Sequence, residues 1–584
     1  MVSKKNILAT AYCEFWGTEY HDSIYLWEGA KHQVPLSQWD KVAATTLENV
    51  FSTKEKICLA HEYCKKIYYK LLPLLAVKLN EIHQLNYPVS FWETVCGRWF
   101  FEYICLVYDK YVCLSKLDLE HTSIKTLDKD SFYTPKGFND ALRCFTSDFG
   151  VQQLVSHYYY LFSHKKFPSI SKKYRFAETF REKWSLGHFW YLAKQSARNL
   201  IKNILPKKKC EIAFVKTRIH EELIRFLVSE SRGKIQSFAL PKIKFFTKDV
   251  NYKKRKKILE IETKKDTFEF FLVQTLYYAV PREVVEQFYD YYPAFLKDIK
   301  TKQFTQIVSE IWIGHFPTAI YVAITQTMGK KLMFPQHGAF TQCHNANMEW
   351  FQFSVADVYI TTGWVSNFPK AVTGGFVCRN ITTYKFETWK KDILYISPAW
   401  FLYTRRFEDT AIVNSFAIRK LRRAMDIIDS IPDSLITYFV LRPRRISCQW
   451  DAEHIWEIEK KPIRIDNFNQ NLLVSISNAK IVIIDQTSTC LAEILATGAP
   501  FLIVQNPQID LLSDEWEGMF DELIKVGVAH TSAHSLMSQL VQVYDNIEQW
   551  WNSNHVREAI AQFKATTIDD PMKVTDYFLS CVNQ

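Results

Sequence analysis

A Gln-His-Gly triplet at residues 336–338 is the first feature of this chain that suggests chemistry. It follows the apolar run Lys331–Pro335, which the pattern predicts to be a strand that ends in a polar loop. In open α/β sheets the loops at the carboxyl ends of the strands line the ligand-binding crevice. We therefore expect His337 to be catalytic, as a general base or as a donor to a phosphate. Gln336 and Gly338 are expected to contact the same phosphate-bearing ligand.

A second polar segment, Asp485–Thr489, joins the β-branched run Ile481–Ile484 to a predicted helix, Cys490–Ala496. Hydroxyl and backbone N–H groups at the start of a helix form an anion site, so Ser488 and Thr489 are expected to hold the phosphate. An ordinary helix cap is the alternative interpretation. Further candidates for binding this ligand lie in this segment and helix or after other predicted strands: Ser397, Pro398, Arg442, Arg444, Asp485, Thr487 and Glu493.

Two arginines and a glutamate extend the candidate site. Arg442 and Arg444 follow a predicted strand, Leu435–Leu441, where guanidinium groups bind a diphosphate or the carboxylate of an acidic sugar bidentately. Plain surface charge is the alternative interpretation of both arginines. Glu349 follows His337 along the chain, and we expect it to reach the crevice as a further catalytic group.

The N-terminal half contributes weaker candidates. Glu28 is a catalytic candidate, and His83 and Trp27 are candidates for contacts with a second substrate. No Asp-x-Asp metal motif stands out, so we expect a reaction that needs neither a metal nor another cofactor. The phosphate-binding motifs Gly-x-x-x-x-Gly-Lys and Gly-x-Gly-x-x-Gly are absent from the sequence, which disfavours ATPase and dinucleotide chemistry.

Length and composition are typical of a soluble globular protein with two or more domains. The chain has 584 residues, 48% hydrophobic and 23% charged, and a single core stops growing at about 250–300 residues. Its thirteen cysteines include no Cys-x-x-Cys pair, so reduced thiols in a cytoplasmic protein are the simplest interpretation. No apolar window is long enough to span a membrane.

Positive charge raises the question of an anionic partner. The formal net charge is +11, and lysines are concentrated within residues 242–265. A solvated helix face is one interpretation of this run, and peripheral contact with an anionic membrane surface is the other. No recognisable nucleic-acid-binding module accompanies the charge, so nucleic acid is not expected as a partner.

Alternating strand and helix patterns predict an α/β protein with two Rossmann-like domains. The first is expected at residues 1–385, with a helical insertion at about 40–300, and the second at 386–565, followed by a tail at 566–584. Predicted elements that position the site are a helix at Phe304–Trp312 and strands at Lys331–Pro335, Val358–Thr361, Ile393–Ser397, Leu435–Leu441, Ile481–Ile484 and Phe501–Val504.

Several segments together resemble a bacterial transferase family of O-antigen and capsule loci. The matching segments are ILATAY, YLWEG, IHQLNYPVSFWETVCGRWF, PQHGAF, ADVYITTGW, ILYISPAW, IVIIDQTSTCLAEILATGAPFLIV and NIEQWW. This family is related to capsule Kdo transferases and to CDP-glycerol glycerophosphotransferases. It also includes enzymes close to capsule pseudaminic acid transferases.

The resemblance implies a GT-B glycosyltransferase, with two Rossmann-like domains that face each other across a cleft and no metal. It further implies transfer of a nonulosonic acid, pseudaminic or legionaminic acid, from a CMP-activated donor to a glycan or lipid-linked oligosaccharide, with retention of configuration. Ser488 and Thr489 would then hold the phosphate, Arg442 or Arg444 the sugar carboxylate, and His337 would assist the departure of CMP. Glu28 would orient the acceptor hydroxyl. Such an enzyme would work in the cytoplasm, with possible peripheral contact at the inner membrane.

The same residues are also compatible with other functions. A Kdo transferase or a CDP-glycerol glycerophosphotransferase would use the same scaffold. A non-catalytic polysaccharide-binding or scaffold subunit is the alternative of another class.

Overall fold

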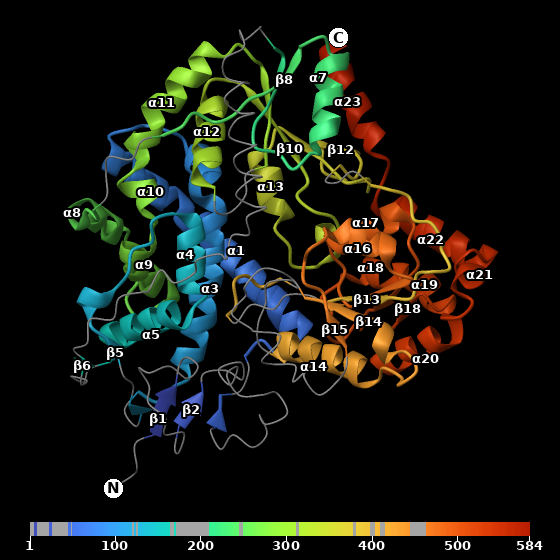
Figure 1. Ribbon diagram of the computed structural model, residues 1–584. Coiled ribbons are helices and arrows are strands. Elements are labelled where there is room, and N and C mark those ends of the chain that lie inside the picture. Colours follow the sequence, from blue (N-terminus) through green and yellow to red (C-terminus); the bar gives the residue numbers. More distant parts are fainter. Residues whose placement is uncertain are drawn as a thin grey trace.

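The protein contains two α/β units, each built on a sheet of parallel strands (Figure 1). The computed structural model describes residues 5–8, 23–25, 45–47, 50–119, 122–123, 126–163, 169–170, 210–243, 249–310, 315–377, 381–397, 403–408, 415–443 and 463–583. Within these ranges each unit contains a six-stranded parallel sheet covered by helices. The arrangement confirms the expected α/β fold of GT-B type, with a helical layer on the N-terminal side.

The first α/β unit has the strand order β12-β11-β10-β9-β7-β8. Its strands are β7 (Ile212–Phe214), β8 (Ile235–Ser237), β9 (Gln306–Val308), β10 (Lys331–Pro335), β11 (Val358–Ile360) and β12 (Ala371–Val372). Its helices are α7 (Glu221–Glu230), α12 (Phe316–Thr327) and α13 (Glu349–Val355), with a short 3-10 turn at Thr341–Cys343. Strand β10 has the bounds that its apolar run predicts.

Strand β9 corrects a sequence prediction, because Phe304–Trp312 was expected to be helical. Ile307 and Val308 are both fully buried and face opposite sides of the sheet, one toward α12 and the other toward the C-terminal helix. A strand buried on both faces has no alternating polar pattern, so a short apolar run is ambiguous between strand and helix.

The second α/β unit has the strand order β15-β14-β13-β16-β17-β18. Its strands are β13 (Ile393–Ile396), β14 (Phe439–Arg442), β15 (Arg464–Ile465), β16 (Ile481–Ile484), β17 (Phe501–Val504) and β18 (Ala529–His530). Its helices are α14 (Ser415–Asp429), α16 (Leu472–Asn478), α17 (Thr489–Thr497), α18 (Asp514–Met519), α19 (Asp521–Lys525), α20 (Ala533–Val543), α21 (Ile547–Trp551) and α22 (Asn554–Thr567). The predicted strands at 481–484 and 501–504 are confirmed. Strand β14 begins later than predicted, because Ile436–Tyr438 form a 3-10 turn.

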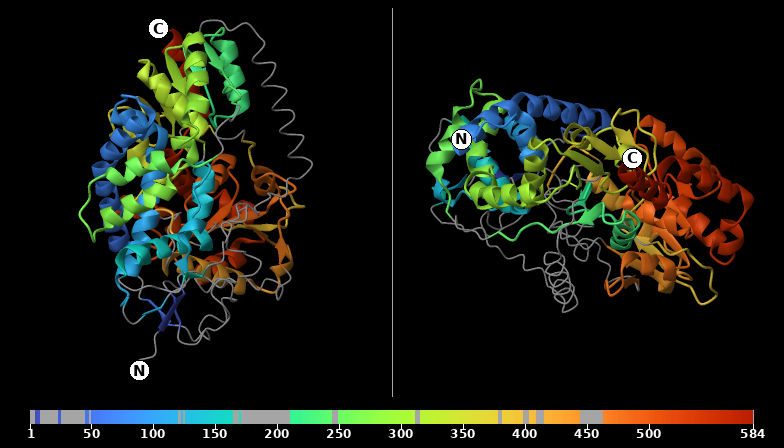
Figure 2. Two further views of the ribbon diagram at one scale, coloured as in Figure 1. Left: turned by 90° about the vertical axis from the view of Figure 1, so that its left-hand side faces the viewer. Right: turned by 90° about the horizontal axis from the view of Figure 1, so that it is seen from above.

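A helical layer packs on one side of the first α/β unit (Figure 2). It consists of α1 (Lys54–His83), α2 (Val89–Trp92), a π-helical turn (Glu93–Gly97), α3 (Arg98–Ser115), α4 (Phe138–Phe145), α5 (Asp148–Phe162), α8 (Tyr252–Arg255), α9 (Phe268–Ala279), α10 (Arg282–Val285) and α11 (Phe288–Thr301), with 3-10 turns at Lys129–Ser131 and Lys256–Glu260. Its dense aromatic side chains are core, as in the stack of Trp99 on Tyr103, whose ring centroids lie 5.5 Å apart. None of the described helices is long and apolar enough to cross a membrane.

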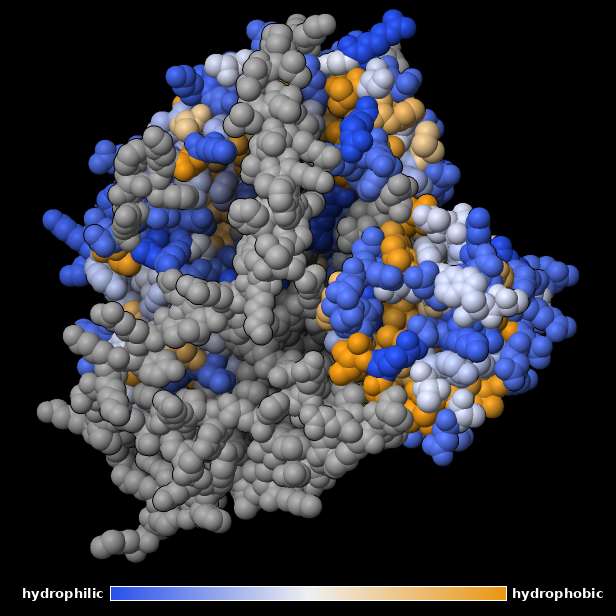
Figure 3. Space-filling model, in the orientation of Figure 1, coloured by the Kyte–Doolittle hydropathy of each residue, from blue (hydrophilic) through white to orange (hydrophobic). Residues whose placement is uncertain are grey.

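Short strands near the N-terminus form a separate parallel sheet, not part of the first six-stranded sheet. They are β1 (Lys5–Leu8), β2 (Ser23–Tyr25), β3 (Thr45–Thr46) and β4 (Thr122–Ser123), while β5 (Thr126–Leu127) pairs with β6 (Ser169–Ile170). On the face shown in Figure 3, hydrophilic residues predominate over the described surface and apolar residues are interspersed among them.

The chain returns to the first α/β unit at its C-terminal end. Helix α23 (Pro571–Asn583), within the segment expected as a tail, lies beside α7 and away from α20–α22 (Figure 1). Its Val574, Phe578 and Val582 are fully buried in one cluster with Phe214 and Leu227. Apolar burial of this kind, at about 25 cal/mol per Å², ties the last helix to the first sheet.

A buried ionic cluster joins the second α/β unit to the helical layer. Glu102 on α3 accepts hydrogen bonds from Arg98 at 3.2 Å and from Nε of Arg405 at 2.8 Å, and it also pairs with Arg406. Burial alone would raise the pKa of Glu102, but the three guanidinium groups lower it to about 2. Because charges buried together are costly to separate, the segment that follows β13 is held firmly against α3.

Candidate active site

The order of the strands predicts where each sheet can bind a ligand. Parallel sheets bind ligands outside the carboxyl ends of their strands, where the strand order reverses. In the first unit that point lies between β7 and β9, which are followed by Arg218 and Glu310, with His337 after the neighbouring β10. In the second unit it lies between β13 and β16, which are followed by Ser397 and the segment Asp485–Thr489. Both polar loops from the sequence therefore follow strands at or beside a switch point.

His337 is paired with a buried carboxylate. Its Nδ1 lies 2.9 Å from Oε2 of Glu310, and Oε1 of Glu310 accepts the backbone N–H of Arg218 at 2.7 Å. An ionised carboxylate only accepts hydrogen bonds, so the geometry assigns the proton to Nδ1 and the lone pair to Nε2. Burial lowers the pKa of His337, Arg218 and Arg98 lower it further, and Glu310 opposes them. The imidazole is therefore neutral at pH 7.

Glu310 was missed from the sequence because it falls inside the segment predicted to be a helix. Its position two residues after β9 is the signal that would have found it, since a carboxylate at that strand end lies beside the loop that follows β10. The correct strand assignment would have placed Glu310 beside His337.

Gln336 holds the histidine loop in place. Its Oε1 accepts the backbone N–H of Thr362 at 3.1 Å and Nε1–H of Trp364 at 2.8 Å. Its Nε2 donates to Thr341 at 3.0 Å and also to Gln342. With both ends of the amide engaged and the residue buried, Gln336 supports the loop, whereas the sequence suggested a contact with the ligand.

Glu349 also supports this loop and does not reach the crevice as predicted. It is buried at the start of α13, where Oε1 accepts the hydroxyl of Thr341 at 2.8 Å and that of Tyr359 at 3.4 Å. Burial raises the pKa of Glu349 to about 7, against the opposing effect of these two hydrogen bonds. Sequence spacing cannot show on which side of a loop a carboxylate lies.

The loop that follows His337 crosses into the second α/β unit. The backbone N–H of Ala339 donates to Oγ1 of Thr489 at 3.3 Å, and a Cβ placed on Gly338 would lie only 2.6 Å from the same oxygen. Phe340 is buried in the core of the second unit, with its ring stacked on Phe563 at 6.1 Å. The structure thus brings together the two segments that the sequence singled out separately.

Helix α17 presents its N-terminus at this junction. Ser488 is its N-cap residue, but its side chain makes no capping hydrogen bond. Ser488 and Thr489 are both partly exposed. Serine normally caps a helix through its hydroxyl, but the hydroxyl of Ser488 does not cap α17. The positive end of the helix dipole is directed toward the loop of Gly338. This arrangement suits a phosphate.

Four predicted ligand contacts lie beneath the site instead. Asp485 is fully buried and accepts the Tyr395 hydroxyl at 2.8 Å, and burial raises its pKa to about 6. Thr487 donates to Gln505 at 2.9 Å. Ser397 and Glu493 are buried as well. These buried side chains support the segment Asp485–Thr489 and helix α17 and do not face a ligand.

Arg442 is engaged within the second unit. Its Nη1 pairs with Asp466 and donates to Oγ of Ser475 at 2.9 Å, while Nη2 donates to the carbonyl of Gln470 at 3.1 Å. The guanidinium therefore fixes the segment after β15, and the expected grip on a diphosphate or a sugar carboxylate has no support in this geometry.

His83 belongs to the core of the helical layer. It is buried, lies 2.9 Å from the carbonyl oxygen of Val284 through Nε2, and stacks on Trp92. Burial lowers the pKa of His83 to about 4. A contact with a second substrate is therefore excluded. The remaining candidates lie outside the described residues: Trp27, Glu28, Pro398 and Arg444.

A metal site is not apparent among the residues that the structure describes, where His, Cys, Asp and Glu side chains form no group of three or more suited to an ion. Metal-independent chemistry stays a prediction.

The close approach of Gly338 to Thr489 is testable by Gly338→Ala. Gly338 has φ +76°, and alanine there meets both backbone strain and Oγ1 of Thr489. The matched control is Gly329→Ala, because Gly329 has φ +74° and nothing within 4 Å of an added Cβ. We expect Gly338→Ala to lower the free energy of unfolding by about 1–3 kcal/mol more than the control, measured by urea denaturation. Equal losses would contradict the contact.

The buried carboxyl of Glu349 predicts a pH dependence of stability. Because its pKa in the folded protein is raised to about 7, its contribution is complete below the unfolded pKa of about 4.3 and is lost as the pH rises through 7. Glu349→Gln keeps a neutral acceptor, so it should gain about 3 kcal/mol relative to wild type between pH 4.5 and pH 8. Thermal unfolding at both pH values measures this gain. Glu62→Gln, at a side chain 56% exposed, is the control, and a gain no larger than the control's would disprove the buried acid.

Comparison with known proteins connects this site to a family. The sequence profile described as LIC12162 family transferase matches residues 5–579, almost the whole chain. No curated protein matches the chain. Among solved structures, the chain is similar to the glycosyltransferase SnogD from Streptomyces nogalater at 12% identity, covering 64% of this chain and 100% of that one, with a TM-score of 0.36.

Two other solved structures are similar at the same level. Acinetobacter baumannii MurG has 11% identity, with 64% of this chain and 99% of that one covered and a TM-score of 0.31. The UDP-GlcNAc 2-epimerase from Neisseria meningitidis has 9% identity, with coverage of 64% and 98% and a TM-score of 0.32. The assignment therefore follows from the near-complete profile match: the chain belongs to the LIC12162 family of transferases.

Proposed function

We propose that the protein is a glycosyltransferase that moves a nonulosonic acid from a CMP-activated donor to a glycan acceptor, with pseudaminic acid favoured and legionaminic acid second. The observation that carries the glycosyl-transfer proposal is the contact between Ala339 and Thr489, which joins a base in the first unit to a helix N-terminus in the second. Membership of a transferase family supports the reaction class. The resemblance of the quoted segments to capsule-locus enzymes supports the choice of donor.

In the proposed reaction, Nε2 of His337 accepts the proton of an acceptor hydroxyl. The acceptor oxygen then forms a bond to the anomeric carbon, while the bond from that carbon to the CMP phosphate oxygen breaks and its electron pair leaves with CMP. The N-terminus of α17 offsets the charge on the departing phosphate. Glu310 stabilises the imidazolium through Nδ1–H. General-base catalysis of this kind contributes about 10²–10⁴-fold.

This role of His337 differs from the expected assistance to CMP departure. A neutral imidazole whose Nδ1–H is donated to Glu310 has no free proton for a leaving phosphate, but it can accept one from a hydroxyl. Direct attack by an activated hydroxyl inverts the anomeric centre, whereas the family resemblance implies retention. We favour inversion because of the hydrogen-bonded pair of His337 and Glu310. NMR of the product's anomeric configuration distinguishes inversion from retention.

The acceptor in this proposal is a capsule or O-antigen glycan, free or lipid-linked, on the cytoplasmic side of the bacterial inner membrane. The net charge of +11 and the exposed lysines of α8 support peripheral contact with an anionic surface. No metal or other cofactor takes part in the proposed reaction.

The test offers CMP-pseudaminate, CMP-Kdo and CDP-glycerol separately to the purified protein and measures nucleotide release. We expect turnover of CMP-pseudaminate, a loss of about 10²–10⁴-fold in His337→Ala, and a smaller loss in Glu310→Gln, which keeps a hydrogen-bond acceptor but removes the charge. His555→Ala, at an exposed histidine, is the control. Circular dichroism establishes that each variant is folded.

Each contrary outcome identifies a different error. Turnover of CDP-glycerol or CMP-Kdo alone contradicts the proposed donor. Undiminished turnover in His337→Ala contradicts the base. Glycan binding without any turnover in the wild type supports the scaffold subunit.

A further inference from the structure

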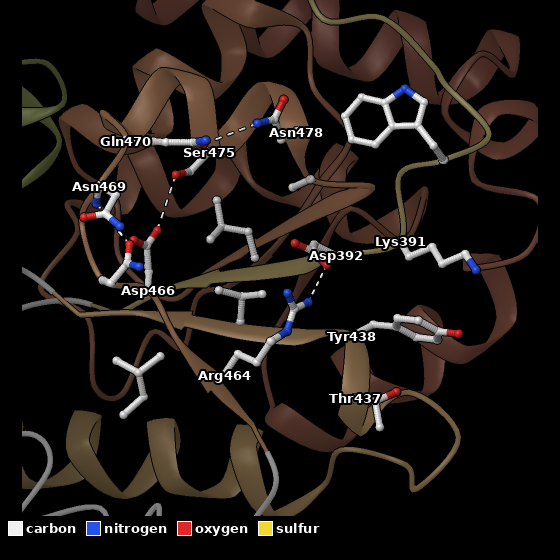
Figure 4. Close-up of a pocket in the computed structure, with 16 residues that line it drawn as sticks. Lys391, Asp392, Thr437, Tyr438, Arg464, Asp466, Asn469, Gln470, Ser475 and Asn478 are labelled. Carbon is white, nitrogen blue, oxygen red and sulfur yellow. Dashed lines mark hydrogen bonds and ion pairs between the residues drawn. The ribbon is translucent and has the colours of Figure 1, made fainter.

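A groove of about 990 Å³ opens on the second α/β unit, apart from the histidine loop and α17 (Figure 4). Its floor is the sheet face formed by Leu394, Val440 and Ile465 on strands β13, β14 and β15. None of its lining residues belongs to the candidate active site. We call this feature the β15 groove, after the edge strand at its rim.

The β15 groove exists because one face of the sheet is incompletely covered. Helix α16, which follows β15, has only seven residues, and β15 has two. Ile465 is consequently 39% exposed although it continues the apolar floor. At about 990 Å³ the volume is at the upper end of the ~300–1,000 Å³ typical of ligand pockets.

Uncharged polar groups dominate the walls. Figure 4 shows Gln470, Ser475 and Asn478 along one side and Asn469 at one end, with Tyr438 at the other. Asn478 donates to Gln470 at 3.3 Å. The four amide residues that line the groove, which are Asn467, Asn469, Gln470 and Asn478, are all exposed to solvent. Each amide offers both donors and an acceptor, which suits a ligand with many hydroxyl groups.

The charges in the β15 groove largely cancel. Two cations, Lys391 and Arg464, and two anions, Asp392 and Asp466, line the groove. Arg464 pairs with Asp392, and Asp466 pairs with Arg442 beneath the wall. The ammonium of Lys391 lies 5.9 Å from the ring centroid of Tyr438. Helix α16 is capped, since Asn471 accepts the backbone N–H of Val474 at 3.0 Å. A phosphate or nucleotide would therefore find neither a cluster of free cations nor an open helix N-terminus here.

An exposed aromatic ring completes the site. Trp389, in the segment that leads into β13, is 61% exposed and lines the groove together with Tyr438. An indole face is apolar and electron-rich, so it attracts the weakly positive C–H face of a sugar ring. Tryptophan and tyrosine rings are enriched at interfaces, and both kinds of ring line this groove.

We infer that the β15 groove binds a neutral oligosaccharide. Its apolar floor, amide-rich wall, exposed indole and lack of net charge match the alternating hydroxyl and C–H surfaces of a glycan chain. This inference rests on the proposed function insofar as the oligosaccharide is a stretch of the glycan acceptor. Binding there holds the acceptor chain on the enzyme at a distance from the transfer site and raises its effective concentration at His337.

The test measures binding of maltotriose, cellotriose, mannotriose and triacetylchitotriose to the full chain by saturation-transfer NMR and calorimetry, with CMP and inorganic phosphate as anionic probes. We expect at least one trisaccharide to bind with a Kd of about 5 mM or tighter. Trp389→Ala and the pair Asn469→Ala with Asn478→Ala should each weaken binding about tenfold, a loss of about 1.4 kcal/mol. Trp389→Phe, which keeps an aromatic face, should lose less, and Asn552→Ala, at an exposed amide elsewhere in the unit, should lose nothing.

Three results would overturn the inference: no trisaccharide binds, binding is unchanged in the Trp389 and asparagine variants, or these variants weaken the binding of CMP or phosphate instead. The test is independent of the proposed reaction, because His337→Ala should leave trisaccharide binding unchanged. Trisaccharide binding that depends on the groove, together with unimpaired transfer in His337→Ala, would contradict the proposed mechanism and still support the glycan site.

Discussion

Insertion of the loop after His337 into the second α/β unit is the interaction on which the site depends. Phe340 is buried among Trp516, Phe520 and Phe563, and it adopts φ +66°, a conformation that bulky residues rarely take. Burial of an aromatic side chain contributes about 1.5–3 kcal/mol, enough to hold that backbone. With Phe340 anchored, Gly338 and Ala339 must pass directly over Thr489. The loop after His337 therefore belongs to one unit and is held in place by the other.

Two further contacts keep the units in register. The N–H of Ser513 donates to the carbonyl of Cys343 at 2.8 Å, which continues the same loop along the second unit. The cluster around Glu102 holds the segment after β13 against the helical layer. Because both contacts are buried or backbone-based, they hold His337 and α17 in a fixed relative position. Such preorganisation reduces the reorganisation needed in a reaction.

The sequence predicts the strands better than it predicts the roles of individual polar side chains. Ile481–Ile484 and Lys331–Pro335 are confirmed to the residue. The first is short and almost purely β-branched, and the second is short and ends at a proline, which are the features that favour a strand over a helix. The sequence predicts a helix where strand β9 lies, and for that reason it does not identify Glu310 as a site residue. The sequence assigns Gln336 and Arg442 to a ligand and Glu349 to catalysis. It cannot show the partners of these side chains, because Trp364, Asp466 and Thr341 are brought to them only by the tertiary fold. The meeting of His337's loop with Thr489 was predictable because both follow strand ends, whereas the orientation of each polar side chain was not.

A crystal structure of the protein with CMP tests the central claim most directly. The account predicts that the phosphate lies at the N-terminus of α17, with an oxygen within about 3.2 Å of a backbone N–H or hydroxyl of Ser488 or Thr489. It also predicts that Nε2 of His337 faces the open side of that phosphate, where the sugar and the acceptor would meet. CMP bound away from α17, or a phosphate at α17 with His337 turned from it, would contradict the account.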